Sequence, residues 1–244
     1  MKTLFHGDAF DNWEAIPDNS IDAVITDPPY GTTSCKWDTT IDLNRFWEQV
    51  ERVKRDEHTP VVVFADQPFT STLVSSKVKW FRHDFIWDKT QVSGGLIARI
   101  APLKTTEDIV VFSEKKANYY WDHIATPLEK VREKDITTQQ MRTAVLRPSK
   151  EHKGRYKTTH TGFPMEVIKE FRPVRGGGYD RHPTQKPVEL MEYLVKLYSK
   201  EGDTILDPFM GSGSTGVAAL NLNRHFVGIE QDEHYFQVAS ERCA

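Results

Sequence analysis

The chain has 244 residues, of which 38% are hydrophobic and 27% charged, and this composition excludes a disordered tail, a collagen and a low-complexity scaffold. Its two cysteines, Cys35 and Cys243, are too few for a disulfide framework or a four-cysteine zinc site, and its apolar runs fall short of the ~20 residues of a transmembrane helix. Because the N-terminus also lacks the pattern of a signal peptide, we expect a soluble, cytoplasmic protein of one large domain or one domain with an insert.

The net charge of −3 is unevenly distributed along the chain. Residues 1–120 carry 14 Lys and Arg against 18 Asp and Glu, and residues 183–244 carry 5 against 9, so each segment has a net charge of −4. Residues 121–182 carry 13 against 8, a net charge of +5. A basic middle segment favours contact with a polyanion, although a solvated basic face has the same composition.

The predicted elements alternate between strands and helices. Short apolar, β-branched runs predict strands, while apolar residues at steps of three and four, or a segment after a Gly-rich loop, predict helices. In chain order these are strand 21–26, helix 42–54, strands 60–64, 84–87 and 108–112, helix 187–199, strand 204–206, helix 214–222 and strand 225–229. Strands that are apolar on both faces suit a parallel sheet covered by helices, so the pattern predicts an α/β fold with a doubly wound, mostly parallel sheet.

Residues 121–182 interrupt this alternation. They are basic, show no clear β-run, and include the turn-rich stretch 175–178. We therefore expect an insert on the α/β core rather than an independent domain. The chain then divides into 1–120, the insert 121–182, and 183–244.

A Gly-rich loop follows the predicted strand 204–206. Gly211, Gly213 and Gly216 match the G-x-G-x-x-G pattern between a strand and a helix, and Glu230 follows the first glycine by 19 residues, where an acid can bind ribose hydroxyls. The pattern favours an adenosine-containing cofactor and by itself also fits an NAD enzyme. No Lys-Ser/Thr follows the glycines, which excludes a phosphate-binding P-loop. Only 28 residues remain after Gly216, so the N-terminal strands must complete the sheet.

A second motif, Asp27-Pro28-Pro29-Tyr30, directly follows the strand 21–26. The prolines fix two φ angles and remove two donors, which predicts a rigid, extended loop at the carboxyl end of the strand. The Asp27 carboxylate and the Pro28 carbonyl are both acceptors and can hold the two hydrogens of an exocyclic amine. The ring of Tyr30 can stack on the base that carries this amine.

Together these motifs resemble the S-adenosylmethionine-dependent DNA amino-methyltransferases of the N6-adenine/N4-cytosine family, in the permuted β order in which Asp-Pro-Pro-Tyr precedes the Gly-rich loop. The resemblance covers nearly the whole chain and extends to 4–8, 64–69, 87–89, 102–112, 182–187 and 206–213. It implies a Rossmann-like class I methyltransferase fold, circularly permuted, in which 121–182 is the target-recognition region. It also implies DNA as the partner and allows a homodimer, but carries no information on a partner restriction endonuclease.

The resemblance further implies roles for individual residues. S-adenosylmethionine would be bound through its methionine part by Asp207, Phe209, Gly211, Ser212 and Gly213, through its ribose by Glu230, and through its adenine by Asp8, Ala9 and Phe10. Its carboxylate would be reached by Thr184, Gln185 and Lys186. Asp27, Pro28, Pro29 and Tyr30 would hold the target base, with Asp27 also bordering the cofactor. Lys150, Lys153, Arg155 and Lys157 are the expected DNA contacts.

The residue types suit direct in-line transfer to an exocyclic amine after base flipping, without a covalent intermediate and without metal. Asp27 favours the N6 of adenine, because the N4-cytosine enzymes of the family more often carry Ser there. N4-cytosine methylation is the alternative. A non-catalytic DNA-binding relative, a protein-glutamine methyltransferase and an NAD oxidoreductase explain fewer of the motifs.

Four side chains have simpler alternatives. Asp8 can cap a helix that begins nearby, and Lys186 can be a surface charge before the helix 187–199. Lys89 suits either a phosphate contact or a solvated strand end. Glu107 is expected to be structural, or to act through a neighbour, rather than to be catalytic.

Overall fold

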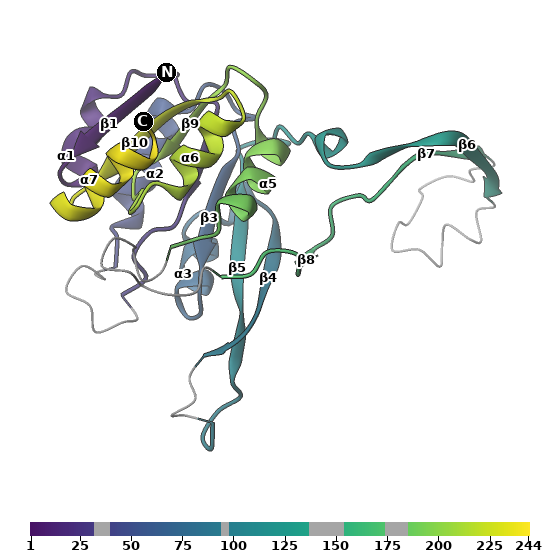
Figure 1. Ribbon diagram of the computed structural model, residues 1–244, viewed down its shortest axis with the longest axis horizontal. Coiled ribbons are helices and arrows are strands. Elements are labelled where there is room, and N and C mark those ends of the chain that lie inside the picture. The colour runs from purple at the N-terminus through teal and green to yellow at the C-terminus, as the bar shows by residue number, and fades with distance from the viewer. Residues whose placement is uncertain (32–39, 94–97, 137–153, 174–184) are drawn as a thin grey trace. The chain divides into compact units, whose positions relative to one another are not determined.

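The computed structural model describes residues 1–31, 40–93, 98–136, 154–173 and 185–244 (Figure 1). These residues form two compact units. The first consists of Met1–Tyr120 together with Met165–Ala244, and the second of Trp121–Pro164.

The first unit is built on an eight-stranded sheet, in which only β5 runs antiparallel to its neighbours β3 and β4. This confirms the predicted α/β fold with a mostly parallel sheet. In spatial order the strands are β1 (Lys2–His6), β10 (His225–Glu230), β9 (Thr204–Asp207), β2 (Ala23–Thr26), β3 (Val61–Ala65), β5 (Lys104–Phe112), β4 (Phe81–Ser93) and β8 (Val167–Ile168).

The strand order shows how the two ends of the chain complete one sheet. The C-terminal strands β9 and β10 lie between the N-terminal strands β2 and β1, with Val24 of β2 beside Leu206 of β9 and Phe5 of β1 beside Ile229 of β10. The Gly-rich loop after β9 and the Asp-Pro-Pro-Tyr loop after β2 therefore leave neighbouring parallel strands at the same edge of the sheet.

Helices cover both faces of this sheet. On one face α2 (Leu43–Val53) and α3 (Phe69–Ser76) pack into the main apolar core, which includes Trp13, Phe46 and Phe112. On the other face, α5 (Val188–Tyr198), α6 (Ser214–Asn221) and α7 (Glu233–Arg242) follow one another (Figure 1). A short helix, α1 (Ala9–Asn12), follows β1. Among the described residues, no helix has the length and apolar character needed to cross a membrane.

The second unit contains an antiparallel hairpin of β6 (Thr126–Ile136) and β7 (Gly154–Thr161). The sequence showed no clear β-run in this segment, so the two strands were not predicted. The strands were not recognised because their described side chains are mostly polar and lie exposed or half-buried, so no apolar run marks them. The Trp121 ring contacts the rings of His160 and Phe163 at the base of the hairpin.

The compact second unit is also shorter than the expected insert. It ends at Pro164, whereas the predicted insert continued to residue 182. The difference arises because the short strand β8 pairs in parallel with β4, with Ile86 beside Val167, and so belongs to the first unit. The elements β1, β8, α3 and α7 were not predicted either. β8 has two residues, β1 is a half-buried strand at the edge of the sheet, and α7 has Ala239 as its buried residue, so these three lack a strong apolar pattern.

Candidate active site

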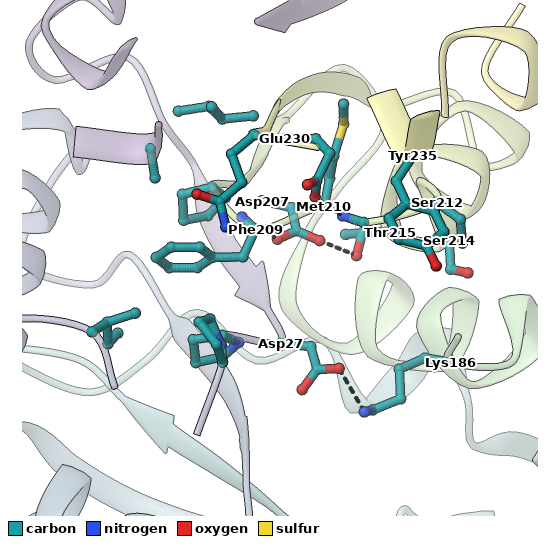
Figure 2. A pocket seen from close by; sticks show the side chains of 18 of the residues that line it. Asp27, Lys186, Asp207, Phe209, Met210, Ser212, Ser214, Thr215, Glu230 and Tyr235 are labelled. Atoms are coloured by element: carbon teal, nitrogen blue, oxygen red, sulfur yellow. Dashed lines mark hydrogen bonds and ion pairs between the residues drawn. The ribbon is translucent and has the colours of Figure 1, made fainter. Parts of the chain in front are cut away.

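A cavity of about 670 Å³ lies in the first unit at the carboxyl ends of the parallel strands (Figure 2). Its walls come from the loops that follow β1, β2, β9 and β10, because the carboxyl ends of parallel strands share one edge of a sheet. The cavity brings together most of the described residues that the sequence nominated: Asp8, Ala9, Phe10, Asp27, Pro28, Pro29, Tyr30, Gln185, Lys186, Asp207, Phe209, Gly211, Ser212 and Glu230.

Asp207, the last residue of β9, ties the Gly-rich loop to the sheet. Its Oδ1 accepts hydrogen bonds from the Thr26 hydroxyl at 2.7 Å and the Phe209 amide at 3.1 Å, and its Oδ2 accepts one from Thr215 at 2.6 Å. Burial raises the pKa of the Asp207 carboxyl to about 6, although these hydrogen bonds oppose the shift. Asp207 lines the cavity, and its carboxylate joins Thr26 of β2 to Phe209 and Thr215 of the Gly-rich segment.

The three glycines of the loop are required for different physical reasons. Gly211 and Gly213 adopt φ angles of 52° and 80°, in the left-handed region that favours glycine. Gly213 is not among the residues that line the cavity. At Gly216 an added Cβ would lie 2.6 Å from the Phe226 ring and 2.7 Å from the Cys243 sulfur, so this glycine permits α6 to pack on β10. The cavity itself is bordered by the turn before α6.

Polar groups of this turn face the cavity. The Ser212 hydroxyl donates to Gln185 Oε1 at 3.1 Å. Ser214, the first residue of α6, is buried and lines the cavity, and within the described part of the chain its Oγ has no hydrogen-bond partner. A buried hydroxyl without a partner, at the positive end of a helix, is suited to an anionic group of a ligand.

The acid at the end of β10 and the acid after β1 also line the cavity. Glu230 accepts hydrogen bonds from the Gly211 amide at 2.9 Å and the Asp232 amide at 2.8 Å, and burial raises its pKa. Asp8 caps α1 by accepting from the Phe10 amide at 2.8 Å, as its simpler alternative proposed, and it also lines the cavity. The ring of Phe10 carries the Arg45 guanidinium at 4.6 Å from its centroid.

Four side chains around the Asp-Pro-Pro-Tyr loop form one closed network. The Lys186 ammonium lies 2.6 Å from Asp27 Oδ2, as drawn in Figure 2, and 2.8 Å from Glu107 Oε1. The Tyr30 hydroxyl lies within hydrogen-bond distance of Asp27 Oδ1 and 3.1 Å from Glu107 Oε1. The Tyr30 ring stacks on Phe69 with centroids 5.4 Å apart. The loop residues are thus fixed by groups from β5 and from the segment before α5.

The pKa values of the charged groups in this network are shifted in different directions. Burial raises the pKa of Asp27, and the nearby Glu107 carboxylate adds to the rise while Lys186 opposes it. Burial by itself would raise the pKa of Glu107. The charge and hydrogen bond of Lys186, the charge of Lys89 and the hydrogen bond of Tyr30 outweigh burial and lower this pKa below its usual value. Burial disfavours the Lys186 ammonium, but the two carboxylates prevail and raise its pKa.

The structure bears on the expectations for Lys186 and Glu107. Lys186 is 8% exposed with its ammonium between Asp27 and Glu107, so the alternative of a surface charge was wrong, whereas its contact with the cofactor carboxylate stays a prediction. Glu107, which the sequence did not nominate as a site residue, lies on the cavity wall, and Lys89 lies 3.5 Å from its Oε2. The signal for Glu107 was its place in the run 102–112, which the resemblance already included.

The expected DNA contacts lie in the second unit or outside the described residues. Lys157 is exposed on β7, and Arg155 lies on the same strand. Lys150, Lys153 and the expected cofactor contact Thr184 lie outside the described residues. Within the described ranges, no group of three or more His, Cys, Asp and Glu side chains is arranged to hold a metal ion.

Comparison with known proteins adds a family relationship. A family model described as DNA methylase (N6_N4_Mtase) matches residues 21–241. The Type II methyltransferases M2.DpnII of Streptococcus pneumoniae and M2.LlaDCHI of Lactococcus lactis subsp. cremoris are 26% and 28% identical to the chain, and each alignment covers 98% of this chain and 88% of the relative.

Solved structures show the same fold over nearly the whole chain. The M1.HpyAVI–SAM complex matches with a TM-score of 0.68 and 26% identity, over 99% of this chain and 98% of the other. The PvuII DNA methyltransferase (cytosine-N4-specific) matches with a TM-score of 0.71 over 100% of this chain and 86% of the other, and its 15% identity supports the fold alone.

Proposed function

Because the chain belongs to the DNA methylase family of N6-adenine and N4-cytosine amino-methyltransferases, we propose that it methylates the N6 amine of adenine in DNA. DNA methyltransfer and the use of S-adenosylmethionine follow from the family, whereas adenine is the proposed target. The observation that carries this choice is the Asp27 carboxylate, which lies at the end of β2 on the wall of the same cavity as the Gly-rich loop. Asp at this position favours adenine within the family.

The residues of the cavity fit S-adenosylmethionine, which supplies a methyl group on a positively charged sulfur. The volume of about 670 Å³ lies within the range of ligand sites, about 300–1,000 Å³. The unpartnered Ser214 hydroxyl at the start of α6 suits the cofactor carboxylate. The Glu230 carboxylate retains acceptor positions for ribose hydroxyls, since each carboxylate oxygen can accept two hydrogen bonds. The Phe10 ring and Asp8 suit the adenine.

At the other end of the cavity, Asp27 and Pro28 would orient the target amine. Each Asp27 oxygen accepts one hydrogen bond in the network, so each keeps a second acceptor position for an amine hydrogen. With the Pro28 carbonyl as the second acceptor, the nitrogen lone pair would be directed towards the methyl group. The contribution of these residues is positioning and electrostatic stabilisation, and no covalent intermediate is needed.

An adenine inside a DNA duplex cannot reach this cavity, so the proposal includes flipping of the base out of the helix. The basic segment 121–182, with the β6–β7 hairpin, is the proposed target-recognition region. Replacing Lys150, Lys153, Arg155 and Lys157 together with Ala should weaken DNA binding and lower the slope of log K against log salt, by up to ~0.9 for each phosphate that these cations neutralise. A slope equal to that of the wild type would place the DNA elsewhere.

The proposal is tested by methyl transfer from labelled S-adenosylmethionine to unmethylated plasmid DNA, followed by nucleoside mass spectrometry. N6-methyladenine is the expected product. N4-methylcytosine would retain the enzyme class and overturn the choice of base. Absence of label from double- and single-stranded DNA, with cofactor binding intact, would favour a non-catalytic DNA-binding relative.

A further inference from the structure

The network around Asp27 contains one side chain for which the transfer described above has no task. Glu107 lies near the start of β5, opposite Trp87 of β4, and its side chain is 9% exposed. It does not belong to the Asp-Pro-Pro-Tyr loop or to the Gly-rich loop. Its Oε1 is nevertheless shared by the Lys186 ammonium at 2.8 Å and the Tyr30 hydroxyl at 3.1 Å, both of which also contact Asp27.

We propose that Glu107 is a positioning residue for the methyl transfer: through Lys186 and Tyr30 it holds the Asp27 carboxylate in the orientation and charge state in which it accepts a proton from the target amine. The inference rests on the proposed function and applies equally to adenine and cytosine, because both carry an exocyclic amine. It assigns a task to the buried acid that the motifs do not explain.

The reaction requires such a proton acceptor. The nitrogen lone pair forms the new N–C bond while the S–C bond breaks, and the sulfur takes the electron pair of that bond and becomes neutral. The nitrogen is then positively charged and must lose one of its two hydrogens as a proton. The proton moves to an Asp27 oxygen that already accepts this hydrogen, and Asp27 becomes a neutral acid until the proton passes to water.

The hydroxyl of Tyr30 shows how Glu107 supports this step. A hydroxyl has one hydrogen, so Tyr30 can donate to Asp27 or to Glu107 but not to both at once. While Asp27 is ionised, Tyr30 donates to it. When Asp27 is protonated, its O–H can donate to the Tyr30 oxygen, and Tyr30 can turn its hydrogen to Glu107. The Tyr30 hydroxyl therefore has both a donor and an acceptor role available whether Asp27 is ionised or protonated.

The charges around Asp27 also indicate that Glu107 makes Asp27 a stronger base. Lys186 is the cation in contact with it, and the Glu107 carboxylate opposes part of that charge. Lys89 faces the far oxygen of Glu107, at 3.5 Å, and Asp207 is a further acid on the wall of the cavity. Without the charge of Glu107, the Lys186 ammonium would act on Asp27 alone and make it a weaker base.

The test is the pH dependence of single-turnover methylation by Glu107→Gln, which keeps the shape of the side chain and removes its charge. We expect a rate roughly 10-fold lower at pH 7.5, a part of the ~10²–10⁴-fold that a general acid–base group contributes, with cofactor affinity unchanged. The acidic limb of the profile should move to lower pH. Glu107→Asp keeps the charge and should lose rate with its acidic limb unmoved. Glu114→Gln, which removes an exposed carboxylate paired with Lys54 at 2.7 Å, is the matched control and should behave as the wild type.

Each outcome separates this inference from the proposed function. A Glu107→Gln profile that coincides with the wild-type profile overturns the inference. A joint loss of rate, cofactor affinity and thermal stability, with the acidic limb unmoved, indicates a purely structural role and also overturns it. A wild type that methylates cytosine changes the base alone, and the comparison of variants stands. A wild type that methylates no DNA overturns both proposals.

Discussion

The Lys186 ammonium holds two acidic side chains together inside the cavity, and its removal should have a large effect on stability. In Lys186→Met the carboxylates of Asp27 and Glu107 lose the cation at 2.6 and 2.8 Å. Breaking a buried ion pair by removing one partner costs about 3–5 kcal/mol. Alternatively, one of the two carboxyls becomes protonated in the folded variant. With a reference pKa near 4, this costs about 4 kcal/mol at pH 7, which agrees with the cost of the broken ion pair. At ~2–4 °C per kcal/mol for a protein of this size, we expect Tm to fall by roughly 6–20 °C at pH 7.

The effect should depend on pH with a definite sign. Without Lys186, the two carboxyls have folded-state pKa values above those of the unfolded chain, so the variant is destabilised at high pH and the loss shrinks as pH falls through those values. Thermal unfolding of wild type and variant at pH 5, 6, 7 and 8, without cofactor, measures this. A Tm difference of equal size at pH 5 and pH 8, or no difference at pH 8, would refute the reasoning. Lys115→Met, which removes an exposed lysine paired with Glu57, is the control and should keep the wild-type Tm.

Three further substitutions test separate parts of the cavity. Asp27→Ala should lower the single-turnover methylation rate by about 100-fold or more, while the Kd for S-adenosylmethionine measured by calorimetry changes little; equal losses in both would place Asp27 with the cofactor instead. Glu230→Ala should raise that Kd by roughly 10- to 100-fold, since hydrogen bonds to a charged group contribute about 1.5–3 kcal/mol, and an unchanged Kd would exclude the ribose contact. Because the pKa of Asp207 is raised to about 6, the free energy of unfolding of the wild type should fall by roughly 3 kcal/mol as pH rises from about 4 through 6. Asp207→Asn should remove this part of the pH dependence, and denaturant unfolding across that range would reveal whether the slope persists.

The elements that sequence alone predicted are those with a strong local cause. The central strands were recognised because they are buried on both faces, as the fully buried β3 illustrates. Helix α2 was recognised from its apolar spacing, and the capping of its first turn by Asp42, which accepts from the Asn44 and Arg45 amides, accounts for where it begins. Sequence missed the β6–β7 hairpin and the pairing of β8 with β4, since a polar hairpin and a two-residue strand are defined by their partners.

The sequence by itself determined the two loops of the cavity and the family to which they belong, because each loop is encoded within a few residues: stiff prolines after β2, and glycines with left-handed φ after β9. Only the tertiary structure decided which charges meet Asp27. Lys186 lies 159 residues from Asp27 along the chain, and Glu107 lies 77 residues from Tyr30. The pairing of these groups depends on the register of β5 against β3 and on where α5 begins, and no local pattern encodes either. The proton affinity of Asp27 follows from that pairing and from burial, so it too is a property of the folded chain.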